Sequence, residues 1–192
     1  MFRKLIVIAV LVSASAVGAT ALAGGSSDLK QAKKATAPYQ DLDTAKAAGY
    51  GLLLDAAGIA CIDMPGQGAM GIHYVNGRLV GDATVDAKTP EAVVYEPQHD
   101  GRLKLVALEY VVFQSAWDAK HSSWPSLFGQ RFDFTKSPNR YGLPAFYSLH
   151  AWIWKHNPAG TFAMWNPRVS CTHANDDGDN TSDNMDGMDM GG

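Results

Sequence analysis

The fold of this chain is decided by one segment, FYSLHAWIWKH, which spans Phe146–His156. Large apolar residues crowd the segment, so we expect it to lie in a core. Side chains of a strand alternate between its two faces, which places His150 on the same face as Trp152 and Trp154. An ionisable residue at this position does not suit a plain apolar core, because burying a lone charge is costly.

Two other apolar segments have the same feature. Gly71–Val75 carries His73 at its centre, and Leu105–Phe113 carries Glu109. Buried ionisable groups are normally paired or bound to a metal ion. Two imidazoles and a carboxylate suit zinc, iron, copper or manganese, and they leave coordination positions open. The sequence therefore predicts a mononuclear site of His73, Glu109 and His150, provided that the sheet curves enough for three strands to converge.

A simpler interpretation satisfies each of these groups separately. His73 would then bond a backbone carbonyl, Glu109 would pair with Arg140 or Arg131, and His150 would be buried and neutral. Core histidines with ordinary hydrogen bonds are common. Both interpretations stay open at the level of sequence.

The first residues resemble a secretory signal. Arg3 and Lys4 form a basic start, Leu5–Val12 is apolar, and small residues lead up to a cleavage site after Ala23. The apolar run is shorter than the roughly 20 residues of a membrane span, although a retained anchor is an alternative. We therefore expect export to the periplasm or beyond the cell, with no stable membrane span after residues 1–23 are removed.

Composition divides the rest of the chain into three parts. Residues 24–35 are small and polar and are expected to form a flexible lead, whereas residues 36–173 suit a single globular domain. Residues 174–192 contain six aspartates and no lysine or arginine, and this methionine-containing tail is expected to be disordered. The net charge of −3 and the lack of a basic patch argue against nucleic acid as a partner.

The chain has two cysteines, Cys61 and Cys171. An even number in an exported chain predicts a disulfide. Closing so long a loop would stabilise the fold by roughly 4–5 kcal/mol. The alternative is a pair of thiolate metal ligands.

Local patterns predict a β-rich α+β domain. A short helix is expected over Leu42–Ala48, and strands are expected over Ala69–Val75 and Leu103–Phe113. Asn76-Gly77 is typical of a tight hairpin turn, with Arg78–Val80 as the returning strand. Such short strands favour a curved antiparallel sheet or a small barrel with a short N-terminal helix.

Four segments together resemble a family of exported bacterial proteins that has no assigned activity. They are Ala69–Asn76 (AMGIHYVN), Pro90–Pro97 (PEAVVYEP), Glu109–Phe113 (EYVVF) and Leu149–Lys155 (LHAWIWK). The resemblance covers residues 39–171 and implies export and a single domain. It implies no catalytic residues.

Two functions follow as hypotheses. The first is an exported metal-binding protein, linked to copper because thioethers such as Met185, Met188 and Met190 suit Cu(I). The metal could serve as a Lewis acid or a redox centre, or it could simply be bound. The second is a non-enzymatic module that binds a small molecule or a glycan in an apolar pocket lined by tryptophans, namely Trp117, Trp124, Trp152, Trp154 and Trp165.

Overall fold

The computed structural model describes residues 19–174 and is built on one antiparallel sheet of seven strands. The strand order is β1-β3-β4-β5-β9-β8, and β2 also pairs with β3. The predicted β-rich α+β fold with an antiparallel sheet is confirmed, and within the described residues no pairing joins the two edges of the sheet, so it is not closed into a barrel. The strands are β1 (Gly51–Leu52), β2 (Cys61–Met64), β3 (Gly68–Val75), β4 (Ala92–Pro97), β5 (Leu103–Phe113), β8 (Asp133–Thr135) and β9 (Phe146–Ala151).

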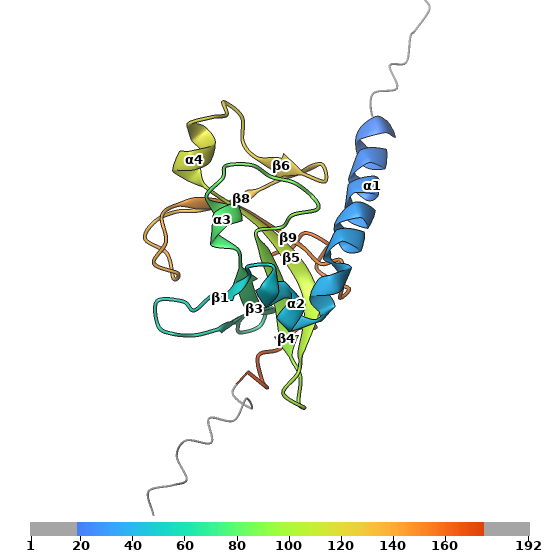
Figure 1. Cartoon of the computed structure of the whole chain (residues 1–192), viewed down its shortest axis with the longest axis vertical. Coiled ribbons are helices and arrows are strands. Elements are labelled where there is room, and N and C mark those ends of the chain that lie inside the picture. Colours follow the sequence, from blue (N-terminus) through green and yellow to red (C-terminus); the bar gives the residue numbers. More distant parts are fainter. Residues whose placement is uncertain (1–18, 175–192) are drawn as a thin grey trace, which may run out of the picture.

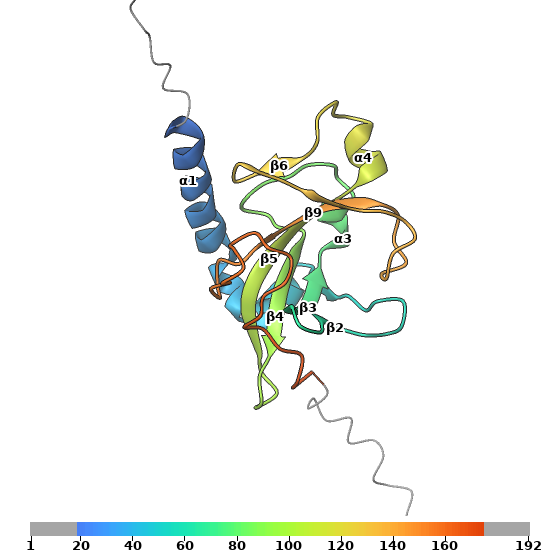
Figure 2. The same ribbon diagram turned by 180° about the vertical axis from the view of Figure 1, so that it is seen from behind.

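Three N-terminal helices lie on one face of this sheet, and the C-terminal segment crosses the other face, although its residues Trp154 and Phe162 pack with the core on the helix side. The helices are α1 (Ala19–Thr36), η1 (Ala37–Gln40) and α2 (Leu42–Ala47), shown beside and in front of the sheet in Figure 1. From behind, residues 152–172 cross in front of β4 and β5 (Figure 2). Each face therefore has its own apolar core, one with Val93 and Tyr95 of β4 and the other with Val94.

The predicted short helix is confirmed as α2. Asp41 caps it by accepting a hydrogen bond of 2.9 Å from the backbone N–H of Thr44, which satisfies one of the free amides of the first turn. The prediction of a flexible lead over residues 24–35 is wrong, because these residues belong to α1. The buried side chain of Ala32 holds α1 in the core. Cleavage after Ala23 stays a prediction, and residues 1–18 and the tail from residue 175 lie outside the described residues.

The prediction of a hairpin turn at Asn76-Gly77 is wrong. Residues 77–80 form a helical turn, α3 (Gly77–Val80), and the side chain of Asn76 caps it by accepting from the backbone N–H of Arg78 at 3.2 Å. Asparagine is common both in hairpin turns and at helix N-caps, so the Asn76-Gly77 dipeptide alone does not distinguish a hairpin from the start of a helix. The strand that returns beside β3 is β4.

The segment Phe146–His156 is a strand only as far as Ala151. Trp152 still follows the face of His150, and their rings stack at 5.9 Å. Trp154 does not, because the chain bends; its indole N–H donates to the hydroxyl of Thr36 at 3.3 Å, on the side of α1. The prediction that Trp154 shares the face of His150 is therefore wrong.

The remaining elements lie beyond one end of the sheet (Figure 1). They are the helix α4 (Gln114–Asp118) and a separate hairpin of β6 (Ser126–Leu127) and β7 (Gln130–Arg131). Within residues 19–174, no helix has both the length and the apolar character needed to cross a membrane.

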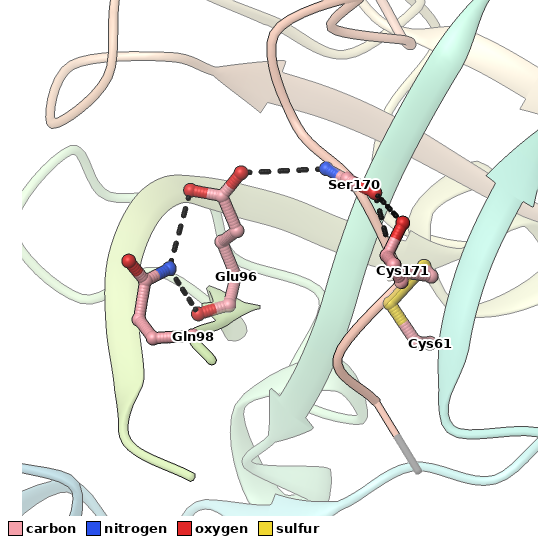
Figure 3. The surroundings of a disulfide bond; sticks show 6 residues. Cys61, Glu96, Gln98, Ser170 and Cys171 are labelled. Atoms are coloured by element: carbon pink, nitrogen blue, oxygen red, sulfur yellow. Dashed lines mark hydrogen bonds between the residues drawn. A yellow bond between two sulfur atoms is a disulfide. The ribbon is translucent and has the colours of Figure 1, made fainter. Parts of the chain in front are cut away.

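The predicted disulfide is confirmed. Cys61 of β2 is bonded to Cys171, 110 residues later, which attaches the C-terminal segment to the sheet (Figure 3). The backbone N–H of Ser170 donates to the carboxylate of Glu96 at 3.3 Å in the same region. Bonded to each other, the two cysteines are not thiolate metal ligands.

Candidate metal centre

Three adjoining parts of the sheet bring His73, Glu109 and His150 together. Glu109 of β5 and His150 of β9 are direct partners in the strand register, on the face that carries Trp152. His73 of β3 lies on the far side of β4, where its register partner is Val94. The imidazole of His73 and the carboxylate of Glu109 must therefore meet across an intervening strand.

A small residue on β4 leaves room for that meeting. The partner of Glu109 on β4 is Ala92, which is fully buried and faces the same side as Val94 because side chains alternate. A methyl group leaves open the space that a larger side chain would fill. Gly71 also brings the strands together, since its φ is +110° and an added Cβ would collide with the backbone oxygen of Tyr95.

The donor atoms have the spacing of ligands around a single ion. Nε2 of His73 lies 3.4 Å from Oε2 of Glu109 and 3.5 Å from Nε2 of His150. One donor atom from each of the three residues lies within 4.8 Å of the others. A tetrahedral ion with bonds of 2.0–2.1 Å separates its ligand atoms by about 3.4 Å, so two of the three separations already match those around a single ion.

Burial sets the protonation of the cluster. It lowers the pKa of both His73 and His150 to about 4, and for His73 the Glu109 carboxylate only partly opposes this. Both imidazoles are therefore neutral near pH 7, which is the form that binds metals. Burial also raises the pKa of Glu109, while His73 and a hydrogen bond from Ser148 act in the opposite direction.

The simpler interpretation fails for the carboxylate. Neither arginine proposed to pair with Glu109 does so. Arg140 forms an ion pair with Asp55 at 2.9 Å, and the guanidinium of Arg131 lies 3.9 Å from the ring centroid of Trp124.

The simpler interpretation, in which each group is satisfied separately, fits the two histidines only in part. His150 is buried and neutral, as that interpretation expects. For His73, Nδ1 is buried and makes no hydrogen bond of normal geometry, although the backbone of Gly71 favours the protonated ring. Nε2 of His73 faces the other two groups of the cluster.

Two pockets open onto the cluster from different sides. The first, which we call the apolar chamber, has a volume of about 180 Å³ and reaches His73 and Glu109. Its walls are apolar and include Leu53, Val75, Val80, Val111, Phe113 and Leu143. The second, which we call the methionine chamber, has a volume of about 200 Å³, reaches Glu109 and His150, and is lined by Met64, Met70 and Met164.

Residues of the loop 136–145 line both chambers, and Tyr141 lines both of them itself. The side-chain oxygen of Asn139 shapes this loop by accepting from the backbone N–H groups of Tyr141 at 3.1 Å and Leu143 at 3.3 Å. Burial, followed by the charge of Glu109, raises the pKa of Tyr141, so its hydroxyl stays a donor. No pattern in the sequence pointed to Tyr141.

The five tryptophans do not gather in one pocket. Trp117 stacks on the exposed His121 at 3.7 Å, and Trp124 packs on Tyr147. Trp165 lines the methionine chamber, while Trp154 lines a separate pocket near Leu103. The apolar pocket that reaches the cluster is walled by aliphatic and phenyl side chains instead.

In comparisons with known proteins, no family model, curated protein or solved structure matches this chain. The resemblance to a family of exported proteins therefore stays an expectation, and the candidate function depends on the geometry of the site.

Proposed function

We propose that this chain is an exported protein that binds one transition metal ion through His73, Glu109 and His150. The observation that supports this most strongly is the spacing of the three donor atoms, which lie within 4.8 Å of one another on three strands of one sheet. Two histidines and one carboxylate leave at least one coordination position for water or another ligand.

The surroundings of the cluster support the same proposal. Ser148 hydrogen-bonds to Glu109 and so orients the carboxylate, as groups behind metal ligands commonly do. In the part of the chain that the structure describes, no arginine or lysine forms an ion pair with these buried groups, and a bound cation would supply the missing charge. A disulfide between Cys61 and Cys171 suits an oxidising compartment, in keeping with export.

Metal titration tests the proposal directly. The purified full chain is stripped with a chelator, and Co(II) is added while d–d absorption is recorded, with elemental analysis for stoichiometry. We expect one ion per chain and the intense absorption of a four- or five-coordinate site. The His73→Ala, His150→Ala double variant should lose the ion.

A matched control uses His121, which is exposed and stacked on Trp117 away from the cluster. His121→Ala should bind Co(II) like the parent protein. Equal binding by the parent and the double variant, or no binding by either, would contradict the proposal.

The apolar chamber favours a second candidate function, the binding of a small apolar molecule next to the metal. Its walls are apolar and its polar groups, His73 and Glu109, lie at one end, the arrangement typical of small-molecule sites. Toluene added to the full chain should shift the methyl resonances of Val75 and Val111, while those of Val169, which does not line the chamber, stay fixed. Unmoved Val75 and Val111 signals would exclude this candidate.

A further inference from the structure

The methionine chamber collects every methionine of residues 19–174. The chain has seven methionines, of which Met1, Met185, Met188 and Met190 lie outside the described residues. The other three line this one pocket, and they come from separate places: Met64 ends β2, Met70 lies in β3, and Met164 belongs to the C-terminal segment.

The same chamber exposes part of the candidate metal centre. Glu109 and His150 are among its lining residues, so an ion at the cluster and the thioethers share one space. Met64 is 38% exposed and Met70 is 6% exposed, so Met64 lies at the surface of the chamber and Met70 lies deeper inside it. Methionine also fills gaps in cores, but gap-filling does not explain three methionines from distant segments around one open pocket.

One sulfur is held in place by a hydrogen bond. The hydroxyl of Tyr141 lies 3.8 Å from Sδ of Met70, and the raised pKa of this tyrosine keeps it a donor. A thioether has a second lone pair, which stays available for a soft metal ion.

The charges in the chamber do not repel a monovalent cation. Arg140 also lines it, but its guanidinium is engaged with the carboxylate of Asp55 at 2.9 Å. The imidazole of His150, the carboxylate of Glu109 and the phenol of Tyr141 are the other ionisable groups of the lining. Soft thioethers together with imidazole select Cu(I) over harder ions.

We infer that the ion of this centre is Cu(I), and that the methionine chamber supplies soft ligands to it through Met70 and Met164. This inference rests on the proposed metal centre and adds the identity of the ion. No change of oxidation state is part of it.

The test compares two metals in one background. The full chain carries M185L, M188L and M190L, so that tail thioethers do not compete. Cu(I) affinity is measured without oxygen by competition with bicinchoninate, and Zn(II) affinity by competition with a chromophoric chelator. Leucine is close to methionine in volume, so Met70→Leu, Met164→Leu should fold normally, and circular dichroism checks this.

We expect the M70L, M164L variant to bind Cu(I) at least about tenfold more weakly, the lower end of what losing a group at a metal site costs. Its Zn(II) affinity should be unchanged. Met64→Leu, at the exposed mouth of the chamber, serves as the matched control and should change Cu(I) affinity less. As a direct observation, Ag(I), a redox-inert substitute for Cu(I), should shift the [¹³C]methyl signals of Met70 and Met164.

Unchanged Cu(I) affinity in the double methionine variant, or an equal loss of Cu(I) and Zn(II), would overturn the inference. Zn(II) binding that depends on His73 and His150 would still support the proposed metal centre. Failure of the parent chain to bind either ion would remove both.

Discussion

The buried carboxyl group of Glu91 should make the stability of this protein depend on pH, and this effect can be tested directly. Glu91 is 2% exposed, and its carboxylate accepts a hydrogen bond of 3.0 Å from the backbone N–H of Val111. Burial raises the pKa of Glu91 to about 8, and the charges of Asp82 and Glu109 add to the effect, while the Val111 bond opposes it. The perturbation is Glu91→Gln, which keeps an oxygen acceptor and removes the ionisation.

The sign follows from proton binding in the two states. Between its ordinary pKa of 4.5 and about 8, the unfolded chain releases the proton of Glu91 while the folded chain keeps it. Stability therefore falls as pH rises through this window, and the full loss is present above it. At about 1.36 kcal/mol for each tenfold change in proton affinity, a pKa of about 8 against 4.5 corresponds to a loss on the order of 4–5 kcal/mol.

Urea denaturation of metal-free protein at a series of pH values, followed by tryptophan fluorescence, measures the effect. His73 and His150 titrate in the same way in both proteins, so the test is the difference between them: the free energy of unfolding of the parent minus that of Glu91→Gln should fall from pH 5 to pH 8. Asp43→Asn removes one exposed carboxylate and serves as the control for net charge. Parallel pH profiles for the parent and Glu91→Gln would refute the reasoning, as would a variant less stable than the parent above pH 8.

Three further sets of substitutions test the disulfide, the close packing of the strands and the space at the candidate metal centre. Cys61→Ser opens a cross-link between residues 110 apart and should lower the free energy of unfolding by roughly 4–5 kcal/mol in urea denaturation. Gly66→Ala should lower the free energy of unfolding by about 1–2 kcal/mol, because Gly66 has a positive φ that a residue with a Cβ rarely adopts. Gly71→Ala should lower it far more, because the new Cβ would also collide with the backbone oxygen of Tyr95. Thermal denaturation measures both changes. Ala92→Val should cost about 1–3 kcal/mol by overpacking and should weaken Co(II) binding in titrations, whereas unchanged affinity would show that no space above this alanine is needed.

The sequence allowed prediction of those strands whose local pattern agrees with their place in the sheet. Leu103–Phe113 is rich in β-branched and aromatic residues and is β5 with the expected bounds. The local sequence pattern was less informative where the same residue types occur in two different structures. Asn76 caps a helix instead of forming a hairpin, and the apolar run after Ala151 bends out of the sheet although its composition continues.

The site was predictable in its members but not in its surroundings. An ionisable residue at the centre of an apolar strand is visible in sequence, and His73, Glu109 and His150 were found in this way. Their convergence depends on strand order, which places β4 between β3 and β5 and is not written in any one segment. Met64 and Met164 are 100 positions apart in the chain, and no local pattern could bring them to one chamber.

The positions of His73, Glu109 and His150 also bear on what the proposed ion would do for the fold. All three project from strands that are paired on both sides, and the disulfide and two apolar cores act independently of the ion. The sheet should therefore hold the donor atoms near their binding positions before the ion arrives, unlike small zinc domains that are unfolded without metal. Without the ion, the buried carboxylate of Glu109 has only the two imidazoles as ion-pair partners among the described residues. Binding then stabilises the protein by mass action and leaves its fold unchanged.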